Sequence, residues 1–494
     1  MLTWRGLGLL LAACAGTVSA AGESFDFETL KARARQQAAA AYSPPPEADA
    51  ALAQIDPARR MAAVLKPRYA PWSMASRFVP LPLAPRAGCA PTLFNSIQAS
   101  GIERFDYRPE LFDWPAAGLP EPGPAATGFC GFRLLYPSPD DGEREDLARF
   151  QGDAWQLVGG GSLWGAAALS VGVIDNDGRV QAAPFREFWL VRPAAGARQL
   201  RLYALADAPA LTAAFQVDLV PGVAGRADVQ VALYPREGAG KLLLAPLAGS
   251  FVQGEHRPGR VLPLQAEVHS VDGLAIHTAA GGWLWRPLDN PPQRSTYSFL
   301  VNTPRGFGLL QRDRDAGHYD PDAPHPRQPD VWLVPGADWG AGQLRLLEAP
   351  AANPDARNVQ VGFVPDQQPA PGAGMAFGYT VQWSTQPSLP RAEGWVIATR
   401  SGAANSDGRR RYAVDFVGPA LQGLPPGAAP VAVIDIGRGG GLQRQHVVAN
   451  PHTGGWRLLF EFDRATDAPL QLRAYLQHAD QPLTETWDYV DPPR

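Results

Sequence analysis

Apolar and polar side chains alternate with a period of two along most of the chain. Val229, Val231 and Leu233 alternate with the residues between them, and the run from 199 to 204 repeats the pattern. Successive side chains of a strand point to opposite faces, so the alternation predicts strands with one buried face. Glycine and proline punctuate these runs, and few segments show a helical period. We therefore expect an all-β fold of packed sheets rather than a parallel α/β sheet.

The last hundred or so residues show the same alternation in a smaller unit. Every second position is apolar from 456 to 462 and again from 470 to 476, which predicts two strands of a small sandwich. A polar, proline-marked stretch without periodicity lies between Trp383 and Trp395. Such stretches commonly join domains. We expect a domain boundary there.

The N-terminal region departs from the strand pattern. Arg5 precedes an apolar run from 7 to 18, and small residues lead up to Ala20, so residues 1–20 fit a Sec-type signal peptide. The alternative is a lipoprotein signal with its lipid on Cys14. Asp26 is placed to cap a helix that the prolines at 44–46 would stop. No later segment approaches the roughly 20 apolar residues of a membrane span, so we expect no transmembrane segment in the mature chain.

The charge balance limits the classes of partner. The 494 residues carry 44 Lys and Arg against 48 Asp and Glu, a formal charge of −4, without a basic block to neutralise phosphates. Nucleic acid is not an expected partner. The 51 glycines and 50 prolines indicate many tight turns, because apolar residues still make up 45% of the chain.

Cysteine usage leaves two readings open. Besides Cys14, the chain has Cys89 and Cys130, which an oxidising compartment would allow to pair, and two buried free thiols fit equally well. The nearby residues show no metal-ligand spacing. We expect no structural metal and no cofactor.

Clustered aromatic and polar residues are candidates for a sugar site, since pyranose rings bind to flat aromatic faces and to fixed polar groups. Trp283 and Trp285 project from one face of a predicted strand, with Arg286 on the other face. The alternative for each tryptophan is core packing. A second cluster follows an apolar strand and fits the edge of a cleft, or else a salt-bridged turn; it consists of Arg314, Asp315, His318 and Tyr319.

Searches for other catalytic motifs exclude several enzyme classes. The eight histidines form no His-Glu-x-x-His pair, and the glycines at 159–161 lack the lysine of a phosphate-binding loop. The chain has no Gly-x-Ser-x-Gly nucleophile elbow. Metalloproteases, nucleotide enzymes and hydrolases of the elbow type are not supported.

Several short segments recur, in order and at compatible spacing, in one known family. They are YRPELF at 107–112, FW at 188–189, YAL at 203–205, APL at 245–247, WRPL at 285–288, GFGLLQ at 306–311 and ETW at 485–487. Together they resemble the OpgG and OpgD family of periplasmic glucan biosynthesis proteins, from about residue 25 to the C-terminus. The resemblance implies a large N-terminal β-sandwich, similar to the supersandwich of sugar mutarotases, at 25–386, and a small immunoglobulin-like sandwich at 394–494. It also implies a periplasmic location and a β-glucan oligosaccharide or polysaccharide as ligand.

The resemblance also implies where catalytic acids would stand. Family members that cleave β-1,2-glucan resemble inverting glycoside hydrolases with two aspartates. Alignment places Ser270 and Arg357 at those two positions. Arginine cannot donate a proton at periplasmic pH, and serine without a base replaces a carboxylate poorly. Asp272 and Asp355, each two positions away, are the candidates for a replacement pair, and both also fit as ordinary turn residues.

Two further segments depart from the family pattern. Residues 164–169 read WGAAAL, where the family carries a tyrosine and an arginine, so polar groups of the implied cleft are lost. The connection from 400 to 412 is short and basic, through the three arginines at 409–411, where OpgD-like members insert a lid. Without a lid, water would be excluded less well from the site.

Three hypotheses follow from these observations. The first is a glucan-binding paralogue that has lost hydrolysis, and the second is an active inverting β-1,2-glucanase or transglycosylase that uses Asp272 and Asp355 or carboxylates near Asp315. The third is sugar epimerisation of the mutarotase kind, for which His269 and His318 are the candidate bases. We favour the first for this chain, with His269 among the substrate-binding residues. Contact with the machinery of glucan synthesis is left open.

Overall fold

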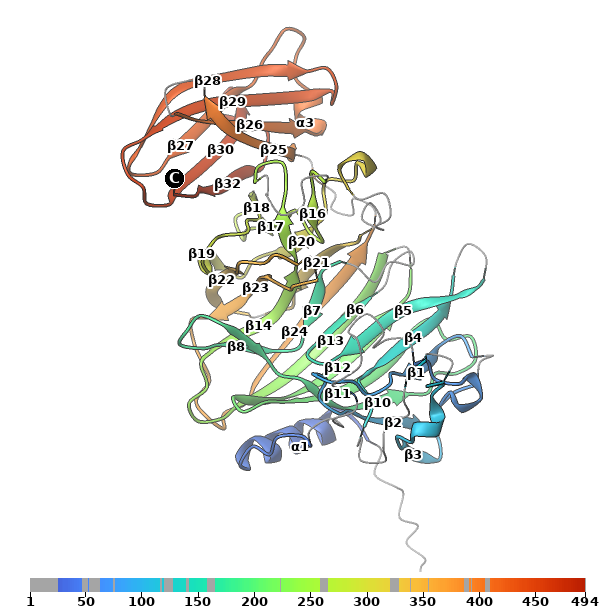
Figure 1. Cartoon of the computed structure of the whole chain (residues 1–494). Coiled ribbons are helices and arrows are strands. Elements are labelled where there is room, and N and C mark those ends of the chain that lie inside the picture. Colours follow the sequence, from blue (N-terminus) through green and yellow to red (C-terminus); the bar gives the residue numbers. More distant parts are fainter. Residues whose placement is uncertain are drawn as a thin grey trace, which may run out of the picture.

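The computed structural model describes a protein built almost entirely of strands (Figure 1). It describes residues 25–46, 52, 63–73, 76–115, 118–119, 128–138, 142–157, 165–222, 224–257, 265–319, 328–337, 339–353, 355–385, 391, 393–404 and 409–493. The expected signal peptide, Cys14 and Trp164 lie outside these residues.

Two large sheets form most of the molecule. The first has eleven strands, which are in spatial order β1 (Val79–Pro82), β4 (Phe132–Pro137), β5 (Arg144–Gln151), β6 (Ala154–Leu157), β7 (Ala167–Leu169), β14 (Lys241–Gly249), β23 (Val359–Pro365), β22 (Ala341–Glu348) and β19 (Ser295–Asn302), with β8 (Gly172–Ile174) beside β14 and β9 (Val180–Ala182) beside β8.

The second sheet has fifteen strands and reaches into the C-terminal region. In spatial order they are β27 (Val431–Ile436), β30 (Leu470–His478), β32 (Thr486–Asp491), β18 (Trp283–Pro287), β17 (Gly273–His277), β20 (Gly306–Leu310), β21 (Asp330–Pro335), β24 (Met375–Ser384), β13 (Ala224–Pro235), β12 (Leu211–Val220), β11 (Leu200–Asp207), β10 (Phe185–Val191), β2 (Leu93–Gln98) and β3 (Gly101–Phe105), with β31 (Gln481–Pro482) beside β30.

Two small sheets complete the strands. A pair joins β15 (Phe251–Gln253) to β16 (Val268–His269), and a four-stranded sheet has the order β25 (Trp395–Ala404), β26 (Arg409–Val417), β29 (Gly455–Arg464) and β28 (Gly440–Asn450). The helical segments are α1 (Phe27–Ala39), η2 (Pro67–Tyr69), η3 (Pro109–Leu111), η4 (Ala316–His318) and α3 (Pro419–Gln422).

The main hydrophobic core lies between the two large sheets. Phe150 of β5 stacks on Trp155 of β6 with ring centroids 5.4 Å apart, and it meets Phe188 of β10 in the opposite sheet at 5.7 Å. The apolar positions of the predicted alternation lie in this core, since Val229, Val231 and Leu233 of β13 are buried there. These observations confirm the prediction of an all-β sandwich fold.

The C-terminal strands form a second sandwich that shares a sheet with the first. The four-stranded sheet packs over β27, β30 and β32, with a core that includes Phe460, Leu472 and Trp487. β32 pairs in parallel with β18 of the large sandwich, where Trp285 stands opposite Trp487. Figure 1 shows the C-terminal strands, β25 to β32, as an orange to red lobe that adjoins β18. Because each sandwich has its own core, we propose that residues 25–386 and residues 394–494 are two domains.

Glycines in β20 allow an aromatic side chain to lie against the strand. A Cβ at Gly306 would come within 2.4 Å of Trp332 on β21, and a Cβ at Gly308 within 2.1 Å of the Val331 carbonyl oxygen. A side chain at either position would therefore displace β21. This close approach explains why the GFGLL segment needs glycine at these two places.

A helix cap and a disulfide are two local features of the N-terminal half of the chain. The Asp26 side chain caps α1 by accepting a hydrogen bond from the Thr29 N–H at 2.8 Å, as predicted. Cys89 and Cys130, which the sequence left either paired or free, form a disulfide with their Cα atoms 5.8 Å apart. Within the described ranges, none of the helices has the length and apolar character needed to cross a bilayer.

Candidate functional site

A groove on the first large sheet contains the positions that the family resemblance marked as catalytic. We call it the Ser270 groove; its volume is about 290 Å³, and its lining residues are Gln156, Gly165, Ala167, Ala248, Gly249, Ser250, Ser270, Asp355, Ala356 and Arg357. The strands β6, β7 and β14 form its floor, and the turn between β22 and β23 forms one wall. The structure thus brings together Ser270, Asp355 and Arg357, which lie up to 87 positions apart in the chain.

Several polar groups that line this groove have hydrogen-bond or ion-pair partners within the protein. The Ser270 hydroxyl oxygen accepts a hydrogen bond from the Ser250 N–H at 2.9 Å. Arg357 pairs with Asp153 at 3.5 Å, and both side chains are about half exposed. The Asp355 N–H donates to the Asn353 side chain at 2.8 Å, which is the Asx-type turn expected at that position. Asp355 is exposed, and among the described residues no hydrogen bond joins its carboxylate to the Ser270 hydroxyl.

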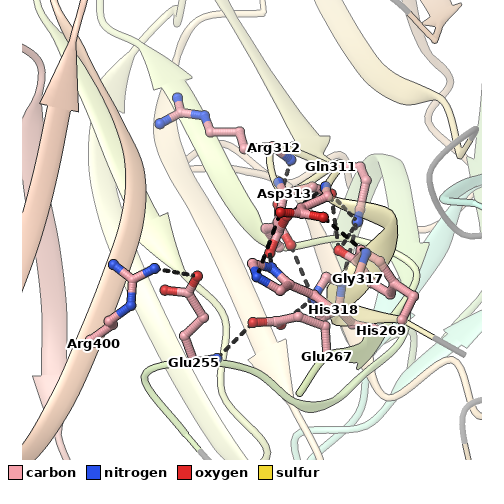
Figure 2. A network of polar contacts seen from close by, with 12 residues as sticks. Glu255, Glu267, His269, Gln311, Arg312, Asp313, Gly317, His318 and Arg400 are labelled. Carbon is pink, nitrogen blue, oxygen red and sulfur yellow. Dashed lines mark hydrogen bonds and ion pairs between the residues drawn. The ribbon is translucent and has the colours of Figure 1, made fainter. Parts of the chain in front are cut away.

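Asp272 lies outside the Ser270 groove. The chain leaves β16 after His269 and enters β17 at Gly273, so residues 270–272 do not follow the alternation of a strand. Asp272 instead joins a cluster that we call the acid–histidine network; its members are Glu255, Glu267, His269, Asp272, Asp313 and His318. Figure 2 labels all of them except Asp272. The two aspartates proposed as a replacement pair therefore do not share one groove.

The inner part of this network is largely buried, with the Glu267 and His269 side chains at most 4% exposed and the Asp272 side chain 15% exposed. His269 Nε2 lies 2.6 Å from Glu267 Oε2 and 3.1 Å from Asp272 Oδ1, and its Nδ1 lies 3.2 Å from the side-chain oxygen of Gln311. The His269 ring stacks on Phe251 with centroids 5.3 Å apart. Since the His269 side chain is 0% exposed, it holds neighbouring groups in place and cannot touch a bulky ligand.

Burial and crowding perturb the acids of the network. Burial raises the pKa of Glu255 to about 7, although Arg400 opposes the shift. Burial also raises the pKa of Asp272 to about 6, against the attraction of His269. The hydrogen bond that His318 donates to the Asp313 carboxylate raises the pKa of His318. These shifts place several protonation changes near neutral pH, which is typical of functional sites and also of buried structural networks.

A small cavity adjoins the network where the two sandwiches meet. Its volume is about 40 Å³, and its lining includes Glu255, Glu267, Asp272, Asp313 and Trp285. Residues from β25 close its other side. Only a few water molecules or an ion would fit in this space.

The residues predicted from the strand at 283–286 lie at the junction of the sandwiches. Trp283 stacks on His277 at 4.2 Å and carries the Arg391 guanidinium 4.2 Å above its ring. Trp285 is buried, with the Arg312 guanidinium 3.5 Å from its ring centroid. Arg286 is buried and pairs with Asp488 at 3.2 Å. All three make packing and ion-pair contacts away from the residues that line the Ser270 groove.

The second predicted cluster is a well-bonded turn around η4. Arg314 pairs with Asp330 at 3.0 Å, and Asp315 caps η4 by accepting from the Gly317 N–H at 2.9 Å. His318 Nδ1 lies 2.6 Å from Asp313 Oδ2, and the buried Tyr319 hydroxyl donates to the Asp313 carbonyl oxygen at 2.9 Å. This cluster shares His318 with the acid–histidine network, and none of its residues lines the Ser270 groove.

Sequence reasoning missed Glu255, Glu267 and Asp313. Glu267 stands two positions before His269, and Asp313 lies inside the conspicuous RDRD run at 312–315, so both had a local signal. Glu255 follows β15 without any motif, and only the pairing of β15 with β16 brings it to the network.

A buried acid in the neighbouring strand β22 leads to a prediction about pH. Glu348 is fully buried, and burial raises its pKa to about 8 although Arg286 opposes the shift. Because the folded state holds the Glu348 proton more tightly than the unfolded state does, this carboxyl stabilises the fold fully below the pKa of the unfolded state. The stabilisation is lost as the pH rises through about 8, and its size is about 1.4 kcal/mol for each unit by which burial raises the pKa. We expect the Glu348→Gln variant to lose less stability than the native chain between pH 5 and pH 9, measured by urea unfolding. The exposed Glu237→Gln variant is the control, and parallel profiles for Glu348→Gln and the native chain would contradict the assignment.

A family model matches nearly the whole chain. The model of a family described as periplasmic glucan biosynthesis protein, MdoG, matches residues 25–490. Among solved structures, the chain is similar to the Slr1438 protein of Synechocystis sp. PCC 6803, at 9% identity and a TM-score of 0.21, over 52% of this chain and 93% of that one. A TM-score this low does not establish a common fold.

Proposed function

The chain belongs to the MdoG family of periplasmic glucan biosynthesis proteins, and on this premise we propose that it binds a β-1,2-linked glucan in the Ser270 groove without cleaving it. Family membership implies a role in glucan biosynthesis in the periplasm. The linkage, the place of binding and the loss of hydrolysis are the proposed parts. The observation that carries them is the set of side chains in the groove.

Hydrolysis with inversion requires a proton donor and a second carboxylate that activates water, about 6.5 to 9.5 Å apart. Among the described lining residues of the groove, Asp355 is the only carboxylate. Arg357 cannot donate a proton, and the Ser270 hydroxyl accepts from the Ser250 N–H and has no hydrogen bond to Asp355 among the described residues. The side chains of Asp355 and Arg357 are exposed at the groove and offer polar atoms to sugar hydroxyls.

The second candidate function is sugar chemistry in the acid–histidine network. The close contacts of His269 with Glu267 and Asp272 favour it, because epimerisation of the mutarotase kind needs a histidine and a carboxylate together. Size opposes it, since sites for small molecules usually have about 300 to 1,000 Å³. The cavity beside the network has about 40 Å³. We therefore rank binding in the Ser270 groove first.

Linear β-1,2-glucan is expected to raise the melting temperature of the purified protein and to show no new reducing ends after prolonged incubation. The Arg357→Ala variant should bind about tenfold more weakly, which corresponds to about 1.4 kcal/mol. The exposed Arg438→Ala variant in the C-terminal region is the matched control and should bind as the native chain does.

Two outcomes would contradict this proposal. New reducing ends that disappear in the Asp355→Asn variant would show that the groove is an active hydrolase. A glucan-induced shift that Arg357→Ala leaves unchanged would place the ligand elsewhere.

A further inference from the structure

We propose that Glu255, Asp313 and His318 form a binding site for a divalent cation of the Zn²⁺ or Mn²⁺ type. Each residue offers one ligand atom, and these atoms all lie within 4.8 Å of one another. The site lies at the junction of the two sandwiches and shares no residue with the Ser270 groove. Figure 2 shows Glu255 and His318 on neighbouring segments, with Asp313 beside the His318 ring.

Backbone contacts hold the three residues in place. Glu255 follows β15, whereas Asp313 lies between β20 and η4 and His318 is the last residue of η4. The Glu267 N–H donates to the His318 carbonyl oxygen at 3.0 Å, and the Glu255 N–H donates to Glu267 Oε1 at 2.8 Å. Glu267 thus ties the two segments together, and the ligands would need little rearrangement to bind an ion.

One oxygen of Glu255 is available as a ligand. Its Oε1 accepts a hydrogen bond from Arg400 at 3.1 Å, while its Oε2 is buried and has no hydrogen-bond partner among the described residues. A buried carboxylate oxygen without a partner is costly. A cation between Glu255 and Asp313 would satisfy it, and both residues line the 40 Å³ cavity, which has room for an ion and a water molecule.

The local charge also favours a cation. Four carboxylates meet here, on Glu255, Glu267, Asp272 and Asp313. The facing cationic or titratable groups are His256, His269, Arg312, His318 and Arg400. Arg312 is paired with Glu485 at 2.5 Å, and Arg400 is shared with Asp415 at 3.1 Å. Asp315 adds a further carboxylate 3.9 Å from His318 Nε2. A divalent ion would relieve the repulsion among these carboxylates.

The ligand set selects the kind of ion. One imidazole nitrogen with two carboxylates suits Zn²⁺ and Mn²⁺, whereas Ca²⁺ and Mg²⁺ prefer oxygen ligands alone. In the absence of an ion, the His318–Asp313 contact of 2.6 Å is a hydrogen bond. The ion must compete with the proton of this pair, so binding should weaken as pH falls.

Zn²⁺ added to the chelator-treated full-length protein is expected to bind at one equivalent, measured by calorimetry and native mass spectrometry, and to raise the melting temperature. His318→Gln and Glu255→Gln should each weaken binding at least tenfold. The exposed His446→Gln variant on β28 is the matched control for binding to a surface histidine and should bind normally. Mg²⁺ at the same concentration should produce no comparable shift.

The absence of stoichiometric Zn²⁺ binding would overturn the proposal, and so would binding that persists in both His318→Gln and Glu255→Gln. Loss of binding in His446→Gln with retention in the other two would identify an adventitious ion only. Circular dichroism shows whether each variant is folded, and Glu255→Gln decides the case if His318→Gln is not. Glucan protection measured in the presence of chelator tests the Ser270 groove separately, so the two proposals can fail independently.

Discussion

The Glu485→Ala variant is expected to lose about 3 to 5 kcal/mol of unfolding free energy, because the change leaves buried cations without their partner. Glu485 is fully buried and receives hydrogen bonds from Arg312 at 2.5 and 3.0 Å and from Arg391 at 2.5 Å. It also accepts from the Val396 N–H at 2.8 Å. The side chains of both arginines are at most 10% exposed.

The two arginines already repel each other. Burial, together with the charge of Arg312, lowers the pKa of Arg391 to about 10 in the presence of Glu485. Without Glu485, the carboxylate that still acts on both guanidinium groups is Asp330, which already pairs with Arg314 at 3.0 Å. The ion pair from Arg312 of the large sandwich to Glu485 of the C-terminal sandwich is also lost. The junction between the sandwiches should therefore weaken first.

Urea unfolding followed by circular dichroism and tryptophan fluorescence measures this loss. Asp435→Ala, which removes an exposed carboxylate on β27, is the control and should change stability by less than about 0.5 kcal/mol. A loss below about 1 kcal/mol in Glu485→Ala would mean that water or another carboxylate replaces Glu485.

Removal of the disulfide between Cys89 and Cys130 is the second large effect, with an expected loss of about 4 kcal/mol. The two cysteines are 41 positions apart, so the bond closes a long loop and restricts the unfolded chain. Cys89 precedes β2 of one large sheet, and Cys130 precedes β4 of the other, so the bond also links the two layers.

The Cys89→Ala, Cys130→Ala double variant and the reduced native chain should show the same lowered midpoint in urea. Addition of a reductant to the double variant is the control and should change nothing. A native chain that keeps its midpoint after complete reduction would contradict the expected contribution of this bond.

The sequence predicted local features well where a short period decides them. The apolar positions at 458, 460 and 462 are buried in β29, and those at 470, 472 and 474 are buried in β30, as the alternation indicated. Asp26 caps α1 because an N-cap depends on a side chain three positions before its partner. Only a few neighbouring residues determine such features.

Contacts over long separations could not be predicted in this way. Arg312 meets Glu485 across 173 positions, and Arg286 meets Asp488 across 202. The parallel pairing of β18 with β32 rests on Leu284 and Trp285 and joins both sandwiches into one sheet. No periodicity within either strand specifies such a partner.

The same distinction between local and long-range features applies to the candidate sites. Ser270 and Arg357 could be identified as unfit for proton transfer from their side chains alone, and this conclusion depends on chemistry rather than on position. Whether Asp272 reaches the Ser270 groove depended on the break between β16 and β17. The cation site depended on Glu255, which no motif marks and which strand pairing carries to Asp313 and His318.

By itself, the sequence determined that the chain forms strands with one apolar face, that Asp26 caps a helix, and which side chains stand at the positions that the family resemblance marks as catalytic. These properties follow from side-chain chemistry and from interactions between residues close in the chain. Only the tertiary structure decided which strands pair, which ion pairs lie buried at the junction, and which acids converge on a histidine. Those features depend on packing two sheets over one core, where residues far apart in sequence become neighbours and lose their contact with water.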